Sequence, residues 1–179
     1  NIVKNLLISS LSNWNPKAYT VLPKEMLYRN GVIYTSLGDY LAKYPINPSK
    51  ATVGIVDMDS PLLAGNMDHF ETLISKLVKK GLNVIPVVGA YSGTNGTQPL
   101  NVYSAMVKFF VYNPAKPNSV VTTTQYEAKP QNFKYRVDSL VSFYTFSLGS
   151  GFIDQTNALL ENMNVPAFRA MTSTKRTEG

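Results

Sequence analysis

The pattern of hydrophobic and polar positions is most regular in the stretch that begins after residue 50. Two continuous apolar runs, TVGIV at 52–56 and LNVIPVV at 82–88, have the length and composition of strands buried on both faces. Between them an amphipathic helix is predicted from about Pro61 to Lys80, and Gly81 stands where a glycine commonly ends a helix. The apolar positions of this helix form one stripe and are its expected core contacts: Phe70, Leu73, Ile74, Leu77 and Val78.

The same alternation continues toward the C-terminus. A second helix is predicted around 100–111, a third strand at 137–146, a third helix at 153–163 and a fourth strand at 164–170. Strands that alternate with helices indicate crossover connections and a parallel sheet. We therefore expect an α/β protein with a parallel doubly wound sheet and flanking helices, of the Rossmann or flavodoxin-like kind.

Two parts of the chain are less regular. Residues 1–50 start with a short amphipathic helix at 1–13 and are then punctuated by proline and glycine, so we expect a helical and irregular lead-in that belongs to a preceding region. Within it, GVIYTS could form a short strand. Residues 51–179 form the expected α/β domain. Its stretch 113–136, rich in Pro, Thr, Asn, Lys and Gln, is expected to be a solvated insertion with one extended piece, SVVTTTQYE.

The amino-acid composition excludes several kinds of catalytic and metal-binding site. The chain has 179 residues, no cysteine and one histidine, which excludes disulfides, cysteine nucleophiles and cysteine-ligated zinc and disfavours a transition-metal site built from histidines. The net charge is +6, but the basic residues form no stripe interleaved with aromatic residues, so nucleic-acid binding is not expected. No apolar run approaches the roughly 18 residues of a membrane span. The N-terminus also lacks a signal-peptide pattern, so we expect a cytoplasmic protein.

Ligands of parallel α/β sheets usually bind at the carboxyl ends of the strands. Three loops lie there in the expected fold, at 57–66, 89–99 and 145–151. The first contains Asp57 and Asp59, two nearby carboxylates that could hold Mg²⁺ or raise one another's pKa.

Helix capping explains most of this first loop without a ligand. Ser60 followed by proline is typical of an N-cap with proline at the first helical position, and carboxylates at a helix start suit its dipole. Asn66 is a second cap if the helix begins later. His69 borders the buried stripe, so it either points into a cleft or bonds a backbone carbonyl, and we favour the bonded structural histidine. No G-x-S-x-G elbow accompanies it.

The other two loops offer backbone and hydroxyl groups. GAYSGTNGTQP is neither a Walker A motif nor a G-x-G-x-x-G fingerprint, and a mobile loop is favoured over a phosphate site. YTFSLGSGF places the hydroxyls of Thr145, Ser147 and Ser150 at a strand end, beside glycine backbone that a ligand can approach. A glycine-rich turn into the next helix also explains this third loop.

Taken in order, these segments resemble the large subunit of the ATP-dependent cobalt and magnesium chelatases, the CobN/magnesium-chelatase H family. The resemblance runs through GVIYTSLGDYLAKYP, TVGIVDMDSPLLAGNMDHFETLISKLVKKGLNVIPVV, VDSLVSFYTFSLGSG and LLENMNVPAFRA. Its most telling parts are the G-x-N-V-I-P-V and L-N-V-P strands and a G-N/D-x-x-H-[YF] element, here Gly65, Asn66, His69 and Phe70. The chain departs from the family pattern at Met58-Asp59, where a polar residue such as arginine is common, and at Thr145, where the family tends to have glycine.

This resemblance implies that the chain is an internal fragment of a much longer subunit that binds a corrin or porphyrin ring and the metal to be inserted. It also implies AAA+ partner subunits that hydrolyse ATP with Mg²⁺ to drive insertion of a divalent metal. The implied function is that of a cobaltochelatase in cobalamin biosynthesis, acting on cobalt and hydrogenobyrinic acid diamide. The alternative is the magnesium chelatase of the chlorophyll pathway, acting on a porphyrin.

The fragment alone is expected to be inactive as a chelatase, with no catalytic residue, bound metal or cofactor of its own. Its expected partners are the remainder of the large subunit, the ATPase subunits and the tetrapyrrole. Its ligand-facing candidates are Asp57, Asp59, Ser60, Asn66, His69, Thr145 and Ser147.

Two other classes of function fit the residues. One is a stand-alone small-ligand binding module of periplasmic-binding or flavodoxin-like type, although DMDSPLL is a poor phosphate-binding loop for a flavodoxin. The other is a hydrolase that uses His69 with Asp57 or Asp59.

Overall fold

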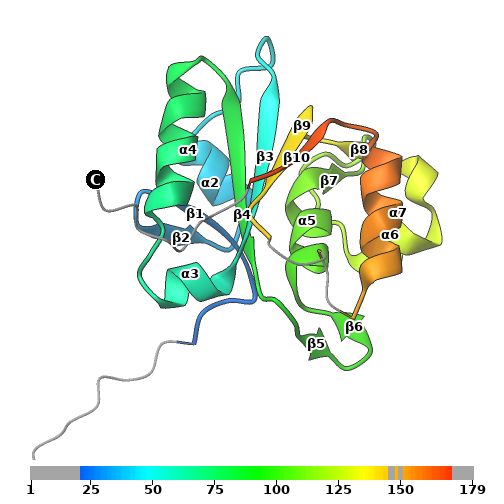
Figure 1. The fold of residues 1–179 in the computed structure, drawn as a ribbon. Helices are drawn as coiled ribbons and strands as arrows, with labels where there is room; N and C mark the ends of the chain where they lie inside the picture. The colour runs from blue at the N-terminus through cyan, green and yellow to red at the C-terminus, as the bar shows by residue number, and fades with distance from the viewer. Residues whose placement is uncertain (1–20, 145–147, 149–150, 171–179) are drawn as a thin grey trace, which may run out of the picture.

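A central sheet with helices on both sides organises the chain (Figure 1). The computed structural model describes residues 21–144, 148 and 151–170. The helix predicted at 1–13 lies outside these described residues.

The sheet has six strands in the order β10-β9-β3-β4-β1-β2. The first four strands of this order pair in parallel, whereas β1 pairs antiparallel with both β4 and β2. The predicted mixed α/β architecture with a mostly parallel sheet and flanking helices is therefore confirmed. The strand bounds are β1 Glu25–Arg29, β2 Val32–Tyr34, β3 Thr52–Met58, β4 Asn83–Gly89, β9 Ser139–Ser142 and β10 Ala167–Arg169.

In the part that the structure describes, the lead-in before residue 50 contains the short strand expected in GVIYTS, which is β2, and a strand that was not expected, β1. β1 and β2 form a hairpin in which Arg29 pairs with Val32, and β1 adds to the sheet beside β4. The two loop residues, Asn30 and Gly31, have φ angles of 51° and 74°. Asn-Gly with two positive φ angles is the turn that matches the twist of a two-residue hairpin.

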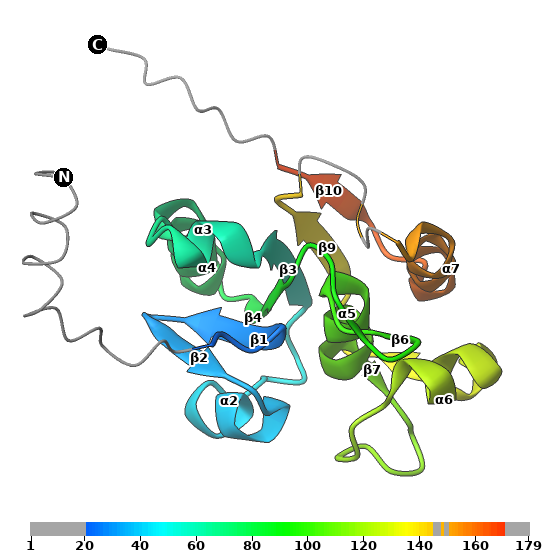
Figure 2. The same ribbon diagram turned by 90° about the horizontal axis from the view of Figure 1, so that it is seen from below.

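Helices cover both faces of the sheet (Figure 2). α3 and α4 lie on one face, and α2 and α5 lie on the other, with α7 and α6 packed outside α5 (Figures 1 and 2). The helix bounds are α2 Leu37–Lys43, α3 Asp59–Leu63, α4 Asp68–Lys79, α5 Val102–Phe110, α6 Thr123–Ala128 and α7 Ile153–Met163, with a short 3₁₀ helix at Pro130–Asn132. Two small hairpins complete the fold: β5 Thr94–Asn95 with β6 Gln98–Pro99, and β7 Val111–Tyr112 with β8 Lys134–Tyr135.

The α5 face holds the larger hydrophobic core, and glycine lets α5 lie close to the sheet. Most side chains of α5 are buried. A Cβ at Gly89 would lie 2.5 Å from the Cα of Val102 at the helix start, and one at Gly54 would lie 2.9 Å from the Phe110 ring at the helix end. Gly89 therefore lets β4 approach the backbone of the helix, and Gly54 leaves room for the Phe110 side chain against β3.

The predicted helix from Pro61 to Lys80 is two helices. α3 ends at Leu63, and Gly65, with a φ of 68°, turns the chain before α4 begins at Asp68. On the predicted stripe, Phe70 and Ile74 are fully buried, whereas Leu73 and Leu77 are half-buried and Val78 is exposed. The predicted C-terminus is confirmed, because Gly81 has a φ of 83° and its N–H bonds the carbonyl of Val78.

The insertion at 113–136 is more ordered than its composition suggested. The piece expected to be extended contains α6, which begins after Thr122. The Thr122 hydroxyl accepts a hydrogen bond from the Gln125 N–H, and the Gln125 side chain accepts one from the Thr122 N–H. This reciprocal capping box fixes a helix start.

Candidate functional site

The carboxyl ends of the parallel strands meet at the lower edge of the sheet in Figure 1, which Figure 2 shows from below. Met58 pairs with Gly89 across β3 and β4, and Val56 pairs with Ser142 across β3 and β9. After β3 the chain forms β4 and then returns to form β9. The chain thus places β4 on one side of β3 and β9 on the other, so the strand order reverses between β3 and β9. Such a switch point is where open α/β sheets usually bind their ligands.

At this switch point Asp57 and His69 form a hydrogen-bonded pair. Alternate side chains of β3 face α4, so Asp57 lies on the same face as the buried Val53 and Ile55. His69, in the first turn of α4, meets it with 2.7 Å between Nε2 and the Asp57 Oδ2. The Asp57 side chain is 2% exposed and that of His69 is 27% exposed. The structure therefore confirms a bonded histidine, but its partner is a carboxylate rather than the expected backbone carbonyl.

The pair determines which nitrogen of His69 is free. Burial raises the pKa of Asp57, and the hydrogen bonds from His69 and from the Met58 N–H, 2.7 Å from Oδ1, oppose that rise. An ionised carboxylate only accepts hydrogen bonds, so His69 Nε2 carries the proton and donates it. In the neutral imidazole the Nδ1 of His69 is then a lone-pair acceptor, and it has no hydrogen-bond partner among the described residues.

Two aromatic residues follow β9 on opposite faces of the sheet: Phe143 packs in the core under α4 and Tyr144 in the core under α5. The ring of Phe143 meets the His69 ring edge to face at 4.8 Å between centroids. Tyr144 is buried, and its hydroxyl donates to the carbonyl of Gly89 at 3.2 Å. Burial first, and then the negative charges of Asp59 and Asp57, raise the pKa of the Tyr144 phenol. Tyr144 is therefore a neutral donor beside two carboxylates.

A cavity of about 240 Å³ opens next to this cluster, between β9, β10 and α7. Tyr144 and Arg169 line it together with the exposed ring of Phe168, which has 61% of its surface accessible. The Arg169 Nε donates to the Tyr144 carbonyl at 2.9 Å and so joins β10 to the site. The sequence analysis did not single out Tyr144, Phe168 or Arg169. The only sequence signal for them was their place at the ends of predicted strands.

The remaining predicted site residues that the structure describes are half-buried or exposed. Asp59 is half-buried near Tyr144, whereas Ser60 and Asn66 are exposed. Neither caps a helix, because the residue before α3 is Met58, the residue before α4 is Met67, and neither helix start has a side-chain cap. Both capping predictions are wrong.

The two hydroxyl candidates of the third loop, Thr145 and Ser147, lie outside the described residues. Within the part of the chain that the structure describes, no three His, Cys, Asp or Glu side chains group to hold a metal ion. No described helix is long and apolar enough to cross a membrane. The loop after β4 forms the β5–β6 hairpin at this same edge of the sheet.

Comparison with known proteins gives one family. The family model described as CobN/Magnesium Chelatase matches residues 2–179. No curated protein matches the chain.

Proposed function

Because the chain belongs to the CobN/magnesium chelatase family, we propose that it is a segment of the large subunit of an ATP-dependent cobaltochelatase and that its carboxyl-terminal sheet edge contacts the tetrapyrrole. The family match over residues 2–179 is the observation that carries this proposal. It also disfavours a stand-alone binding module. We further propose that the parallel part of the sheet is of the Rossmann or flavodoxin-like kind.

The switch-point site suits part of a large, flat macrocycle. A tetrapyrrole offers an apolar face, a central set of ring nitrogens and carboxylate or amide arms at its rim. Phe168 supplies exposed aromatic surface for the face, and Arg169 supplies a cation near the rim. The acceptor Nδ1 of His69 is suited to a ring N–H, because Asp57 holds the opposite nitrogen as a donor.

The site is suited to binding and positioning rather than to a complete metal insertion. A metal must lose water and a free-base ring must lose protons during insertion, and one histidine can accept one proton at a time. The sequence holds no Walker A motif, so we assign ATP and its Mg²⁺ to AAA+ partner subunits. The rest of the large subunit supplies the other groups, and the whole assembly is cytoplasmic in this proposal.

A hydrolase is the weaker alternative. The Asp57–His69 pair resembles the base and orienting acid of a catalytic triad. However, no serine or threonine hydroxyl bonds His69 in residues 21–144, 148 and 151–170. Without a nucleophile beside it, the pair serves to orient the histidine toward a ligand.

The test is tetrapyrrole binding by the full-length protein with His69→Gln. Hydrogenobyrinic acid diamide and a water-soluble free-base porphyrin are titrated separately, and ring absorbance reports the Kd. Loss of one hydrogen bond is worth about 0.5–1.5 kcal/mol, so the Kd should rise up to about tenfold. Lys76→Gln is the matched control, because Lys76 lies on the same helix at an exposed position.

The ring that binds more tightly identifies the substrate and hence separates the cobalt pathway from the magnesium pathway. ATP hydrolysis by the partner subunits should be unchanged in both variants. If His69→Gln binds each ring as tightly as the parent does, the carboxyl edge does not contact the tetrapyrrole.

A further inference from the structure

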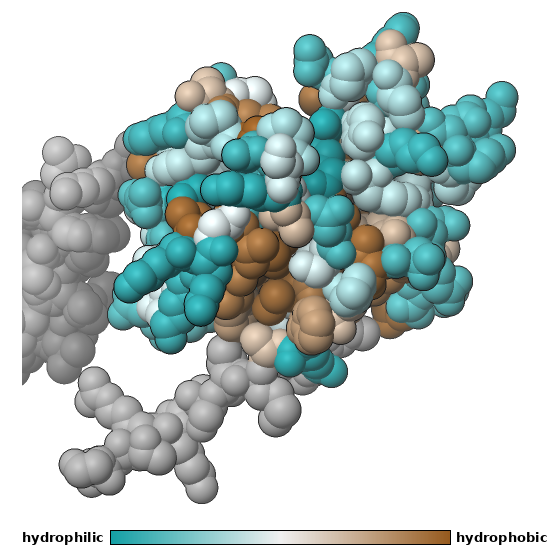
Figure 3. Space-filling view, turned by 90° about the horizontal axis from the view of Figure 1, so that it is seen from above, coloured by the Kyte–Doolittle hydropathy of each residue, from teal (hydrophilic) through white to brown (hydrophobic). Residues whose placement is uncertain are grey.

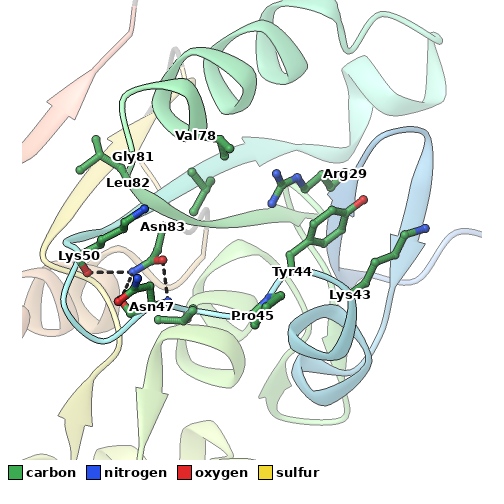
Figure 4. A pocket seen from close by; sticks show the side chains of 12 residues that line it. Arg29, Lys43, Tyr44, Pro45, Asn47, Lys50, Val78, Gly81, Leu82 and Asn83 are labelled. Carbon is green, nitrogen blue, oxygen red and sulfur yellow. Dashed lines mark hydrogen bonds between the residues drawn. The ribbon is translucent and has the colours of Figure 1, made fainter.

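A second candidate site lies at the opposite edge of the sheet, where β3 and β4 begin. A cavity of about 280 Å³ lies there between the end of α2, the end of β1 and the turn from α4 into β4 (Figure 4). Its lining includes the cationic residues Arg29, Lys43 and Lys50 and no acidic residue. Figure 3 shows the molecule from the side of this edge, where hydrophilic side chains surround a central apolar area.

Arg29 is held in place and is incompletely partnered. Its guanidinium stacks on the Tyr44 ring at 3.8 Å from the centroid, and its Nη1 donates to the Tyr40 hydroxyl at 3.2 Å. Its Nε is buried without a hydrogen-bond partner. Among the described residues Arg29 has no carboxylate within ion-pair distance. A fixed guanidinium with an unused buried donor is arranged for an acceptor that the chain itself does not supply.

Lys50 stands on the other side of the cavity on a rigid segment. The side chain of Asn83 donates to the carbonyls of Asn47 and Lys50, both at 2.8 Å, and accepts from the Asn47 N–H at 3.0 Å. Asn83 is buried at the start of β4, so these bonds fix the segment against the sheet. In Figure 4 the Lys50 amine and the Arg29 guanidinium point toward the space between them, whereas Lys43 points away.

The walls between the two cations are apolar in part. Val78 from the end of α4, Leu82 from the turn and Pro45 and Ile46 from the segment after α2 line the cavity, together with the polar Asn47 and Asn83. Its volume is just below the roughly 300–1,000 Å³ of ordinary ligand pockets. An inorganic anion would leave these walls without a contact. A small organic acid would place its carboxylates on the cations and its carbon atoms against the walls.

We propose that this cavity binds a small organic carboxylate between Arg29 and Lys50. The site lies at the opposite sheet edge from Asp57 and His69, so it is separate from the tetrapyrrole contact proposed above. Either assignment stands if the other fails, because the two are tested with different ligands and different variants.

The experiment is a calorimetric titration of the full-length protein with succinate at low ionic strength. Succinamide, its neutral analogue, and inorganic phosphate are titrated in parallel. We expect saturable binding of succinate and a Kd that rises about tenfold or more in Lys50→Gln and in Arg29→Gln, the loss expected for a hydrogen bond between charged groups. Lys76→Gln, at an exposed site outside the cavity, should bind succinate as the parent does.

Arg29 also stabilises its own strand end, so Lys50→Gln carries the test if Arg29→Gln fails to fold. The Lys50 side chain is exposed and has no hydrogen bond among the described residues, and its loss should leave the fold intact. The proposal is overturned if succinate gives no saturable heat, if succinamide or phosphate binds as tightly, or if Lys50→Gln and Lys76→Gln bind succinate equally well.

Discussion

Replacing Gly89 with alanine should push the start of α5 away from β4 and destabilise the fold. The added Cβ would lie 2.5 Å from the Cα of Val102, 2.9 Å from its N and 3.0 Å from its Cβ. Carbon atoms in contact are about 3.5–4.0 Å apart, so the helix start must move away from β4 by about 1 Å. The two nearest atoms belong to backbone and the Cβ is bonded directly to it, and the Val102 N–H also bonds the Ala90 carbonyl at 3.0 Å. No side-chain rotation can therefore relieve the overlap.

Overpacking of a core typically costs about 1–3 kcal/mol, and a backbone overlap should reach at least about 3 kcal/mol of unfolding free energy. For a chain of this size, about 1 kcal/mol lowers the melting temperature by roughly 2–4 °C. Gly89→Ala should therefore melt roughly 6–12 °C below the parent in a thermal denaturation followed by circular dichroism.

Gly54→Ala is the matched comparison, because its Cβ would meet side chains instead of backbone. The neighbouring atoms are Phe110 Cζ at 2.9 Å, Val137 Cγ1 at 3.2 Å and Leu140 Cδ1 at 3.3 Å. Small adjustments of these side chains should keep the cost near about 1–3 kcal/mol. A melting temperature of Gly89→Ala equal to that of the parent, or above that of Gly54→Ala, would refute the argument from close backbone approach.

Two further predictions concern the face of the sheet that carries α4. Ile74→Ala should lower the unfolding free energy by about 2–5 kcal/mol. Leu73→Ala should lower it by clearly less, because Leu73 is only half-buried whereas Ile74 is 2% exposed. Equal urea midpoints for the two variants would contradict this prediction. Folding raises the pKa of Asp57 above 3.8, so the folded protein binds the proton of this carboxyl more tightly than the unfolded chain does. The parent should therefore lose stability as the pH rises from 3.8 through the pKa of Asp57 in the folded state. In Asp57→Asn this loss is absent, so the stability of the variant relative to the parent should increase across that range. A relative stability that does not change with pH would show that Asp57 carries no such shift.

Local patterns in the sequence predicted the elements with a regular burial pattern. α7 was expected at 153–163 and spans Ile153–Met163, and the runs at 52–56 and 82–88 are β3 and β4 within two residues. The two strands are buried along almost their whole length and α7 buries one stripe, so periodicity alone defines all three.

The two missed elements, β1 and α6, depend on short signals that were available in the sequence. Asn30-Gly31 is a strong hairpin signal, and it predicts β1 as the partner of the strand expected in GVIYTS. Thr122 and Gln125 have the spacing of a capping box, and they predict α6. By contrast, no local signal shows that β1 would pair with β4, because that contact joins segments more than fifty residues apart.

The sequence suggested Asp57 or Asp59 as a partner of His69 only in the hydrolase hypothesis, and it did not decide between the two carboxylates. Strand alternation places Asp57 on the same face as Val53 and Ile55, and the helical stripe places His69 beside Phe70, which packs against that face. Combining the two periodicities would have predicted the contact. Tyr144 and Arg169 could not be found in this way, because they join the site through the pairing of β10 with β9.

The energetic balance of Asp57 indicates what the pair does. A buried carboxylate is unfavourable, and the rise in its pKa reports that cost. A neutral asparagine could also accept the Met58 N–H, so the charge is not needed to satisfy the backbone. However, the amide nitrogen of asparagine can donate to His69 Nε2 and allow the tautomer in which Nδ1 carries the proton. Only the carboxylate requires Nε2 to be the donor, which leaves Nδ1 of the neutral imidazole as an acceptor. In the ring contact proposed above, Asp57 is therefore a positioning residue for His69, and its burial fixes that orientation before the ring binds.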